Sequence, residues 1–389
     1  MSRSHSRWVA VLLLTSACAT TPRPASESAS GEGSGEAVAL NVRSVPDSRS
    51  RHFLTPPELM KRIESSPVQY LIQDLESLKG VAPEQLVDVV WPHGPEPLDV
   101  PVVARSADGS RVVRPAKFNP EAMALIHQAE VHYRAERYAE AEKLYAQALE
   151  KEPGNYLAAL NLGDAALFSG DPKTALTRYE RAARINPDDH RSYFYRGTAL
   201  VHLDRMAEAR DMYARALTLR PEHPYVTHAL DQNADTLGIR LQPRVLRPRA
   251  LARVEGKGVS VHIDPASPWF AYGLCKALWL GEESHREEMT GERDYHPTNI
   301  EELECLGLLG AVYARFQEEG KPKDPALERF MRIVEDGYGK ELILYEVLAR
   351  QAPHVVLTLD PEARERLHQY VLRYVMPLEG EGDPGNISL

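Results

Sequence analysis

The chain has little excess positive charge and lacks the motifs typical of several enzyme classes. Its 46 Lys and Arg face 56 Asp and Glu, which gives a net charge of -10. A nucleic-acid partner is therefore not expected, because phosphate backbones attract basic proteins. There is no phosphate-cradling glycine loop, no H-E-x-x-H pair and no G-x-S-x-G, and Gly256-Lys257-Gly258 is too short for a Walker loop and predicts a turn. We expect neither catalysis nor a cofactor.

The N-terminus has a hydrophobic run that is too short for a membrane span. Trp8 to Leu14 is seven residues long, whereas a bilayer requires about 20. It follows a short basic stretch with Arg3 and Arg7, and it leads into the small residues before Cys18. This order predicts a signal peptide over residues 1–17 that is removed from the mature protein.

The residues around the predicted cleavage site carry a family resemblance. Leu14-Thr15-Ser16-Ala17-Cys18 resembles a bacterial lipobox, although Thr15 stands where leucine is usual. The resemblance implies that Cys18 is lipidated, and three acyl chains would anchor the protein stably. It also implies an outer-membrane location facing the periplasm, because Ala19 rather than Asp follows the cysteine. The alternative is an ordinary signal peptide with an incidental cysteine.

A tether is predicted after the anchor. Residues 20–37 are rich in Ser, Gly, Glu and Pro and have no apolar period. Such a segment cannot bury a core, so residues 18–50 are predicted to be the anchor site and a disordered tether.

The middle of the chain repeats itself every 34 residues. A shift of 34 aligns small, aromatic and proline positions in five columns: Ala129, Gly163 and Gly197; Ala141, Ala175 and Ala209; Tyr145, Tyr179 and Tyr213; Ala148, Ala182 and Ala216; Pro153, Pro187 and Pro221. In the first unit, Ala141, Tyr145 and Ala148 lie on one face of the second helix, and Pro153 ends that helix. Each unit is therefore predicted to be a helical hairpin.

The period and these columns resemble the tetratricopeptide repeat (TPR), a helix-turn-helix of 34 residues. The predicted units are 122–155, 156–189 and 190–223, and residues 224–238 resemble a capping helix, so that the repeat region spans 122–238. Units of this size lack a core of their own and stack to share one. The predicted fold is mainly α, with an α-solenoid of three units and a cap at its centre.

The resemblance implies a groove lined by the first helix of each unit. Its mixed aromatic and charged surface would suit a protein or peptide with apolar and charged anchors. The residues placed there are Ile126, Glu130, Tyr133, Arg134, Leu160, Asn161, Asp164, Phe168, Arg191, Phe194, Tyr195, Thr198 and His202, with His228 and Gln232 on the cap.

Some TPR domains clamp a pair of C-terminal carboxylates with Lys and Asn. Asn161 and Arg191 fit that pattern, but Ile126, Glu130 and Tyr195 occupy the other three positions. Glu130 would repel the charge that the clamp binds. A clamp of this kind is not expected.

The flanks predict further elements. Residues 51–117 are predicted to be a small separate α+β element, with a hairpin at Val100–Arg105 and Arg111–Arg114. Residues 239–264 look like an extended β-type connector. A helical domain is predicted over 265–378, followed by a disordered tail at 379–389. Its candidate helices are Ser267–Leu280, Asn299–Glu319, Pro325–Asp336, Lys340–Ala352 and Pro361–Val375.

Cys275 and Cys305 remain after the anchor cysteine. An even pair in an exported protein suggests a disulfide, whereas their apolar helical contexts equally suit buried free thiols. A nucleophilic cysteine is a third alternative, but no His lies at a persuasive spacing.

Two groups of polar residues are candidate metal or catalytic sites. Glu282, Glu283, His285, Glu287 and Glu288 could hold a metal, but without a recognised ligand spacing they predict a solvated charged loop. His262 and Asp264 share a strand face, and the pattern alone favours a structural role. No metal site is therefore expected.

The interpretation that these features favour is a TPR scaffold lipoprotein for protein–protein interaction in the bacterial cell envelope. The process, whether assembly, secretion or pilus biogenesis, is left open, as are the partner and the oligomeric state. The alternative is an envelope enzyme with its active site in the C-terminal helical domain. That hypothesis requires a pocket where His262, Asp264, Cys275 or the 282–288 carboxylates converge.

Overall fold

A computed structural model of the protein describes residues 51–78, 80–82, 85–107 and 109–380. The predicted signal peptide, Cys18 with its tether, and residues 381–389 of the predicted tail lie outside the described residues. Glu379 lies within them, and its backbone N–H donates to the carbonyl of Gly238 at 2.8 Å. The start of the predicted tail is therefore tied to the end of the repeats.

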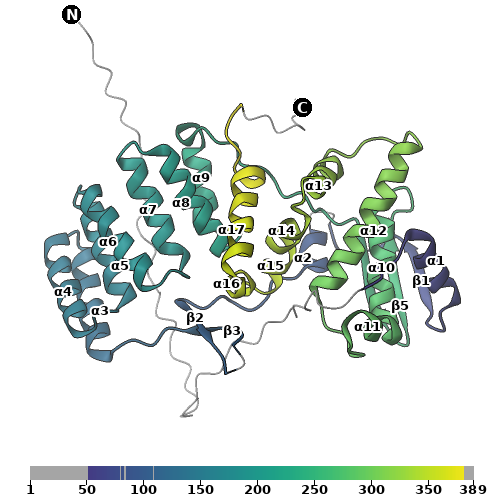
Figure 1. Cartoon of the computed structure of the whole chain (residues 1–389), viewed down its shortest axis with the longest axis horizontal. Helices are drawn as coiled ribbons and strands as arrows, with labels where there is room; N and C mark the ends of the chain where they lie inside the picture. The colour runs from purple at the N-terminus through teal and green to yellow at the C-terminus, as the bar shows by residue number, and fades with distance from the viewer. Residues whose placement is uncertain (1–50, 79, 83–84, 108, 381–389) are drawn as a thin grey trace, which may run out of the picture. The chain divides into compact units, whose positions relative to one another are not determined.

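The repeat region forms consecutive antiparallel helices, each packed against the next (Figure 1). The three hairpins are followed by α9, as predicted. The mainly helical solenoid fold is thereby confirmed. In chain order the helices are α3 (Pro120–Arg134), α4 (Tyr138–Lys151), α5 (Tyr156–Phe168), α6 (Pro172–Ile185), α7 (His190–His202), α8 (Met206–Leu219) and α9 (Pro224–Leu237).

Side chains just before the helices set where they begin. Asn155 accepts a hydrogen bond from the N–H of Ala158 at 2.9 Å, and Asp171 accepts one from Thr174 at 3.0 Å. These caps satisfy backbone donors that have no partner inside the helix. At the other end, α9 stops at Gly238, whose φ of 62° is left-handed.

The turn inside each hairpin also repeats. Glu136, Gly170 and Asp204 lie 34 residues apart, and each has a positive φ, of 57°, 88° and 57°. Only glycine adopts this region without a steric cost, so the first and third units carry local strain that the second avoids.

The core of each hairpin is a tyrosine packed against a small residue of the first helix. Tyr179 and Tyr213 are almost fully buried, and a Cβ added at Gly163 or Gly197 would overlap their rings. Close helix approach therefore requires the small-residue column. Ala129 is fully buried in the corresponding position of the first unit.

Residues 51–117 are not a separate element, contrary to the prediction. The strand β1 (Tyr70–Asp74) pairs in parallel with β5 (Gly258–Ile263), which pairs antiparallel with β4 (Ala250–Glu255). Parallel strands need a long crossover, and here it includes the whole repeat region. The helix α1 (Pro56–Ser65) packs on α10 and α12 of the C-terminal part, and η1 (Leu75–Ser77) lies against β5. Residues 70–77 are thus a strand followed by one 3-10 turn.

The remaining N-terminal elements lie against other parts of the body. The helix α2 (Leu86–Val90) contacts β4, and the hairpin β2 (Pro101–Arg105) with β3 (Arg111–Pro115) contacts α16. Asn186 donates to the carbonyl of Pro101 at 2.9 Å, which ties the hairpin to the repeats. The predicted pairing of β2 with β3 in a hairpin is present.

The C-terminal part is helical, as predicted. It follows the sheet and includes two π-helical turns: η3 separates α14 from α15, and η4 follows directly after α17. The helices are α10 (Trp269–Gly281), α11 (Glu283–Thr290), α12 (Asn299–Glu318), α13 (Pro325–Glu335), α14 (Gly339–Ile343) with η3 (Leu344–Leu348) and α15 (Ala349–Gln351), α16 (Val355–Thr358), and α17 (Pro361–Tyr370) with η4 (Val371–Val375).

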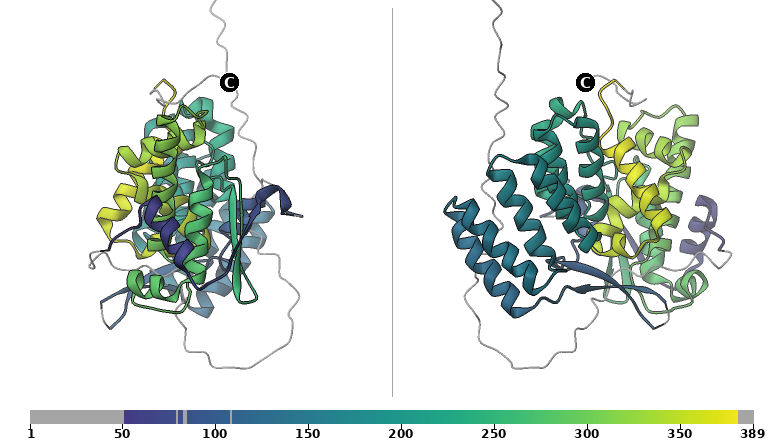
Figure 2. Two further views of the ribbon diagram at one scale, coloured as in Figure 1. Left: turned by 90° about the vertical axis from the view of Figure 1, so that its right-hand side faces the viewer. Right: turned by 60° about the vertical axis from the view of Figure 1, so that its left-hand side comes forward.

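This helical part packs on the last repeat (Figure 2). Arg210 on α8 donates to the carbonyl of Leu372 at 2.7 Å, and His368 on α17 lies 2.8 Å from Asp211 on α8. The contact uses α8, the second helix of the third unit. None of the described helices is long and apolar enough to cross a membrane.

Candidate functional site

The candidate groove is built from α3, α5 and α7, the first helices of the three units. Three of its predicted residues are buried in the core instead: Ile126 is 1% exposed, Leu160 3% and Asp164 8%. Helical periodicity placed them near the groove, but the packing of the second helices closes over them. They cannot contact a ligand directly, which corrects the prediction for these three positions.

An aromatic cluster joins the first two units. The ring of Tyr133 lies 5.8 Å from that of Phe168 in an edge-on arrangement, and Tyr138 stacks on Phe168 at 6.2 Å. All three are half-buried. Such clusters are rigid apolar anchors at protein interfaces.

A second aromatic cluster lies at the third unit. Tyr195 stacks on Tyr179 at 5.5 Å, and Phe194 contacts Tyr195 at 5.2 Å and Tyr213 at 5.8 Å. Thr198 lies beside it, with its hydroxyl 3.2 Å from that of Tyr213. Phe194, Tyr195 and Thr198 are half-buried, so one side of each is open to solvent.

A buried carboxyl group underlies these clusters. Asp164 accepts a hydrogen bond from the hydroxyl of Tyr179 at 2.6 Å. Burial raises the pKa of Asp164 to about 7, although the Tyr179 bond and Arg191 oppose the rise. Asp164 therefore positions Tyr179 beneath Tyr195 and does not act as a free surface charge.

Arg191 is held by carboxylates of its own chain. It lies 2.7 Å from Asp189 and 3.1 Å from Asp99, and it also donates to the carbonyl of Asp99 at 2.7 Å. Burial raises the pKa of Asp189, but the neighbouring Arg191 guanidinium outweighs that effect and holds the pKa below its usual value, so that carboxyl stays ionised.

The pairing of Arg191 affects which ligands this face can bind. With Arg191 paired to Asp189 and Asp99, its charge is already neutralised. A ligand carboxylate would have to displace these partners, which strengthens the argument against a carboxylate clamp.

Polar residues line the exposed part of the face. Glu130 and Arg134 form an ion pair at 3.6 Å on α3, and Asn161 is half-buried on α5. Arg134 and the remaining three predicted residues are exposed: His202 on α7, with His228 and Gln232 on α9. The face can thus offer aromatic edges, amides and charges of both signs to a peptide.

Two residues of this face were not predicted from the sequence. Tyr138 begins α4, a second helix, so projecting the first helices did not include it. Asp99 lies 92 residues before Arg191, and no periodic signal connects the two. The sequence signal that pointed to second helices was the column of tyrosines at 34-residue spacing, because these tyrosines lie on the second helices.

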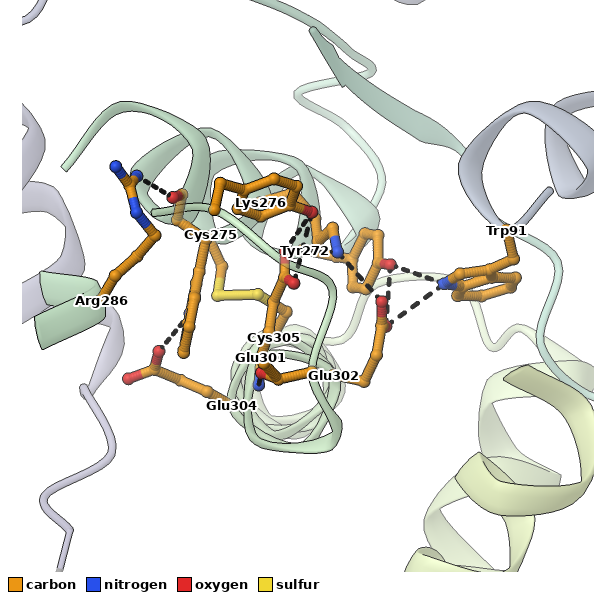
Figure 3. A network of polar contacts seen from close by, with 12 residues as sticks. Trp91, Tyr272, Cys275, Lys276, Arg286, Glu301, Glu302, Glu304 and Cys305 are labelled. Atoms are coloured by element: carbon orange, nitrogen blue, oxygen red, sulfur yellow. Dashed lines mark hydrogen bonds and ion pairs between the residues drawn. A yellow bond between two sulfur atoms is a disulfide. The ribbon is translucent and has the colours of Figure 1, made fainter. Parts of the chain in front are cut away.

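The C-terminal helices hold a separate polar network around the paired cysteines (Figure 3). Lys276 lies 2.5 Å from Glu301 and 3.0 Å from Glu302. Burial lowers the pKa of Lys276, but the two carboxylates outweigh it and raise that pKa well above its usual range. Trp91 and Tyr272 both donate to Glu302, at 3.2 and 3.0 Å. The network joins the N-terminal segment to α10 and α12.

Glu304 is the acceptor of a second group of bonds. Its carboxylate accepts from Trp279 at 2.7 Å and from the backbone of Leu54 at 3.0 Å, and it lies 2.8 Å from Nε2 of His285. Because Arg62 can only donate, its contact at 3.0 Å makes Nδ1 of His285 the acceptor. The geometry therefore assigns a neutral ring that donates from Nε2 to Glu304.

The segment 282–288 is helical and not a loop, contrary to the prediction, although its Glu283, Glu287 and Glu288 side chains are exposed to solvent as expected. It forms most of α11, with His285 1% and Arg286 7% exposed. Arg286 donates to the carbonyl of Trp279 at 2.6 Å. Charge density alone could not distinguish this helix from a loop, because the buried partners come from distant segments.

The candidate residues of the enzyme hypothesis each make separate contacts. Cys275 and Cys305 form a disulfide across α10 and α12, with Cα atoms 5.3 Å apart, so neither sulfur is a thiolate nucleophile. His262 lies 3.3 Å from the hydroxyl of Ser77, and Asp264 caps the N–H of Ala266 at 2.9 Å. Over the described part of the chain, no three His, Cys, Asp or Glu side chains are grouped to hold a metal ion.

The comparisons with known proteins concern the repeat region. The family model described as tetratricopeptide repeat matches residues 126–167 and 160–224. Among curated proteins none matches the chain.

Solved structures match about a third of the chain. They include the first TPR domain of the human RPAP3 protein, at 24% identity over 30% of this chain and 91% of that chain, with a TM-score of 0.29. The Sgt2 TPR domain from Aspergillus fumigatus is 20% identical over 31% and 81%, with a TM-score of 0.30. The Yersinia enterocolitica secretion chaperone SycD with a YopD peptide is 19% identical over 31% and 91%, with a TM-score of 0.29.

Five in-register columns, three stacked hairpins and the family match agree on the same residues. Repeats of this type suggest a protein–protein interaction scaffold. The middle of this chain, residues 126–224, therefore consists of tetratricopeptide repeats.

Proposed function

We propose that the protein is a TPR scaffold lipoprotein of the bacterial cell envelope that binds a protein or peptide ligand across α3, α5 and α7. The observation that carries the binding half is the row of half-buried aromatics, from Tyr133 and Phe168 to Phe194 and Tyr195, flanked by exposed charges. Rigid aromatic anchors with a polar surround are typical of protein interfaces. The process in which it acts, envelope assembly, secretion or pilus biogenesis, is not specified by this surface.

The anchoring half rests on the N-terminal sequence. In this proposal Cys18 carries the lipid, the segment after it is the tether, and the body faces the periplasm from the outer membrane. The disulfide between Cys275 and Cys305 supports an oxidising compartment, because structural disulfides are rare in the cytosol.

The binding half is tested with groove variants of the full chain. Phe168→Ala with Arg134→Ala removes one anchor and one exposed charge from the face, whereas Arg184→Ala changes an exposed arginine on the second helix α6. Partners are crosslinked in intact cells, purified with the tagged chain and quantified by mass spectrometry. The proposal predicts a partner that is lost with the groove variant and retained with Arg184→Ala. A set of partners that is the same for all three chains would refute it.

The anchoring half is tested independently by labelling cells with radioactive palmitate. The wild-type chain is expected to be labelled and to sediment with outer membranes. Cys18→Ser is expected to lose the label and to be released from the membrane fraction. A wild-type chain without label would overturn this half and leave the groove result unaffected.

A further inference from the structure

A cavity of about 420 Å³ lies where the hairpin β2–β3, the third repeat and α17 meet. The hairpin contributes residues 103–105 and Arg111. The repeat region contributes one face of α8 and the residues Pro187, Asp188 and Tyr193, and α17 contributes its first turns. The volume is within the range of sites for small molecules. The cavity is distinct from the groove, which is built on the first helices of the units.

Its wall is basic in a chain of net charge -10. Four arginines line it, Arg105, Arg111, Arg215 and Arg364, against the two carboxylates of Asp188 and Glu365. The arginines and carboxylates of the wall together leave an excess of two positive charges. Such a concentration of guanidinium groups is suited to anions, because each presents a planar fork of donors.

The arginines differ in how far their charge is matched. Arg364 lies 2.9 Å from Asp188, and Arg215 lies 3.1 Å from Asp211 and 3.6 Å from Glu365. Arg105 instead donates to the carbonyl of Gly109 at 3.2 Å, and Arg111 donates to the carbonyl of Leu359. In the described residues, then, the hydrogen bonds of Arg105 and Arg111 go to carbonyl oxygens and leave their full charges unmatched.

Two atoms of the wall residues are buried without a hydrogen-bond partner in the structure: Nε of Arg364 and Nδ1 of His368. His368 is 2% exposed, and its Nε2 is engaged by Asp211 at 2.8 Å. Buried polar atoms are nearly always paired with protein, water or a bound group. Both residues line the cavity, beside the unmatched arginines.

We propose that this cavity binds a small anion with two or more negative groups, carboxylate or phosphate. Arg105 and Arg111 reach it from the hairpin, and Arg215 and Arg364 reach it from the repeat and α17. Tyr193 and Leu219 provide an apolar wall for its carbon skeleton. The occupant connects three segments that are far apart in sequence, so its binding also stabilises the contact between the repeats and the C-terminal helices.

The test is isothermal titration calorimetry of the full chain at low ionic strength, with citrate as the carboxylate probe and pyrophosphate as the phosphate probe. The variant is Arg105→Gln. The Arg105 side chain is exposed and donates to the nearby carbonyl of Gly109, so its replacement should disturb the fold little. The control is Arg253→Gln, an exposed arginine on β4. Circular dichroism establishes that both variants are folded.

We expect at least one probe to bind the wild-type chain and Arg253→Gln equally, and Arg105→Gln to bind it about tenfold more weakly, as for loss of one charge-assisted hydrogen bond. Arg105→Lys, which keeps the charge, is expected to recover part of the affinity. Binding of citrate alone identifies a carboxylate ligand, and binding of pyrophosphate alone identifies a phosphate ligand. The proposal is wrong if neither probe binds, or if Arg253→Gln weakens binding as much as Arg105→Gln.

Discussion

The small-residue column gives a quantitative test of how the hairpins close. Gly163 on α5 faces the ring of Tyr179, which is fully buried, and an added Cβ would overlap that ring. Gly163→Ala should still gain about 1 kcal/mol from helix propensity, because glycine is a poor helix former. The sign of the net effect is therefore decided by packing.

The packing cost exceeds that gain. Overfilling a tight contact costs about 1–3 kcal/mol, since the ring or the backbone must move. Moving Tyr179 also breaks its 2.6 Å bond to Asp164, and leaving that buried group unpaired costs about 1–3 kcal/mol more. Subtracting the propensity gain leaves a net destabilisation of about 1–5 kcal/mol.

The assay is urea unfolding followed by circular dichroism, with the free energy of unfolding compared between variants. Gly197→Ala is the internal comparison, because its added Cβ would lie 2.9 Å from the nearest ring atom of Tyr213, a milder overlap, and it should cost less. Ala129→Gly removes a Cβ for which the first unit has room. Its free energy of unfolding should fall by about 1 kcal/mol, because glycine has a lower helix propensity than alanine. A Gly163→Ala chain as stable as the wild type, or more stable, would refute the packing argument.

Three further predictions concern single contacts. Replacing Cys275 and Cys305 together by alanine should lower the free energy of unfolding by about 2–5 kcal/mol, and dithiothreitol should destabilise only the wild type; equal sensitivity of both chains would contradict the bond. Burial raises the pKa of Asp164 from 3.8 to about 7, so between those values the folded state holds a proton that the unfolded state has released. Stability should then fall as pH rises from about 4 to 7, and Asp164→Asn should flatten that slope in urea titrations at pH 5 and 7; an unchanged slope would argue against it. Glu136→Gly should stabilise the first hairpin by about 0.5–1 kcal/mol by relieving its left-handed φ of 57°, measured as a rise in melting temperature, whereas no rise would show that the turn is unstrained.

The repeats could be predicted because their determinants are local. Small residues, the aromatic column and Pro153, Pro187 and Pro221 lie at fixed spacings, and each acts within one helical hairpin or on its neighbour. The hairpin at 101–115 was predicted for the same reason, since a tight turn joins its two strands.

The rest depended on contacts between distant segments. The pairing of β1 with β5 joins residues on either side of the repeats, and no period of the sequence records which strand is its neighbour. The helix α11 was mistaken for a loop because the groups that hydrogen-bond its buried His285 lie on α1 and α12. Ile126 and Leu160 were assigned to the groove because periodicity gives the face of a helix and not what covers it.

The sequence by itself determined the solenoid of hairpins, their first helices and the aromatic positions between them, because helix periodicity and close-packed small residues act over one 34-residue unit. Tertiary structure alone decided which of those side chains stay open to a ligand, that Asp99 neutralises Arg191, and that four arginines from three segments surround one cavity. Burial and charge pairing are properties of the assembled body, and they are set by which surfaces meet when the chain is folded.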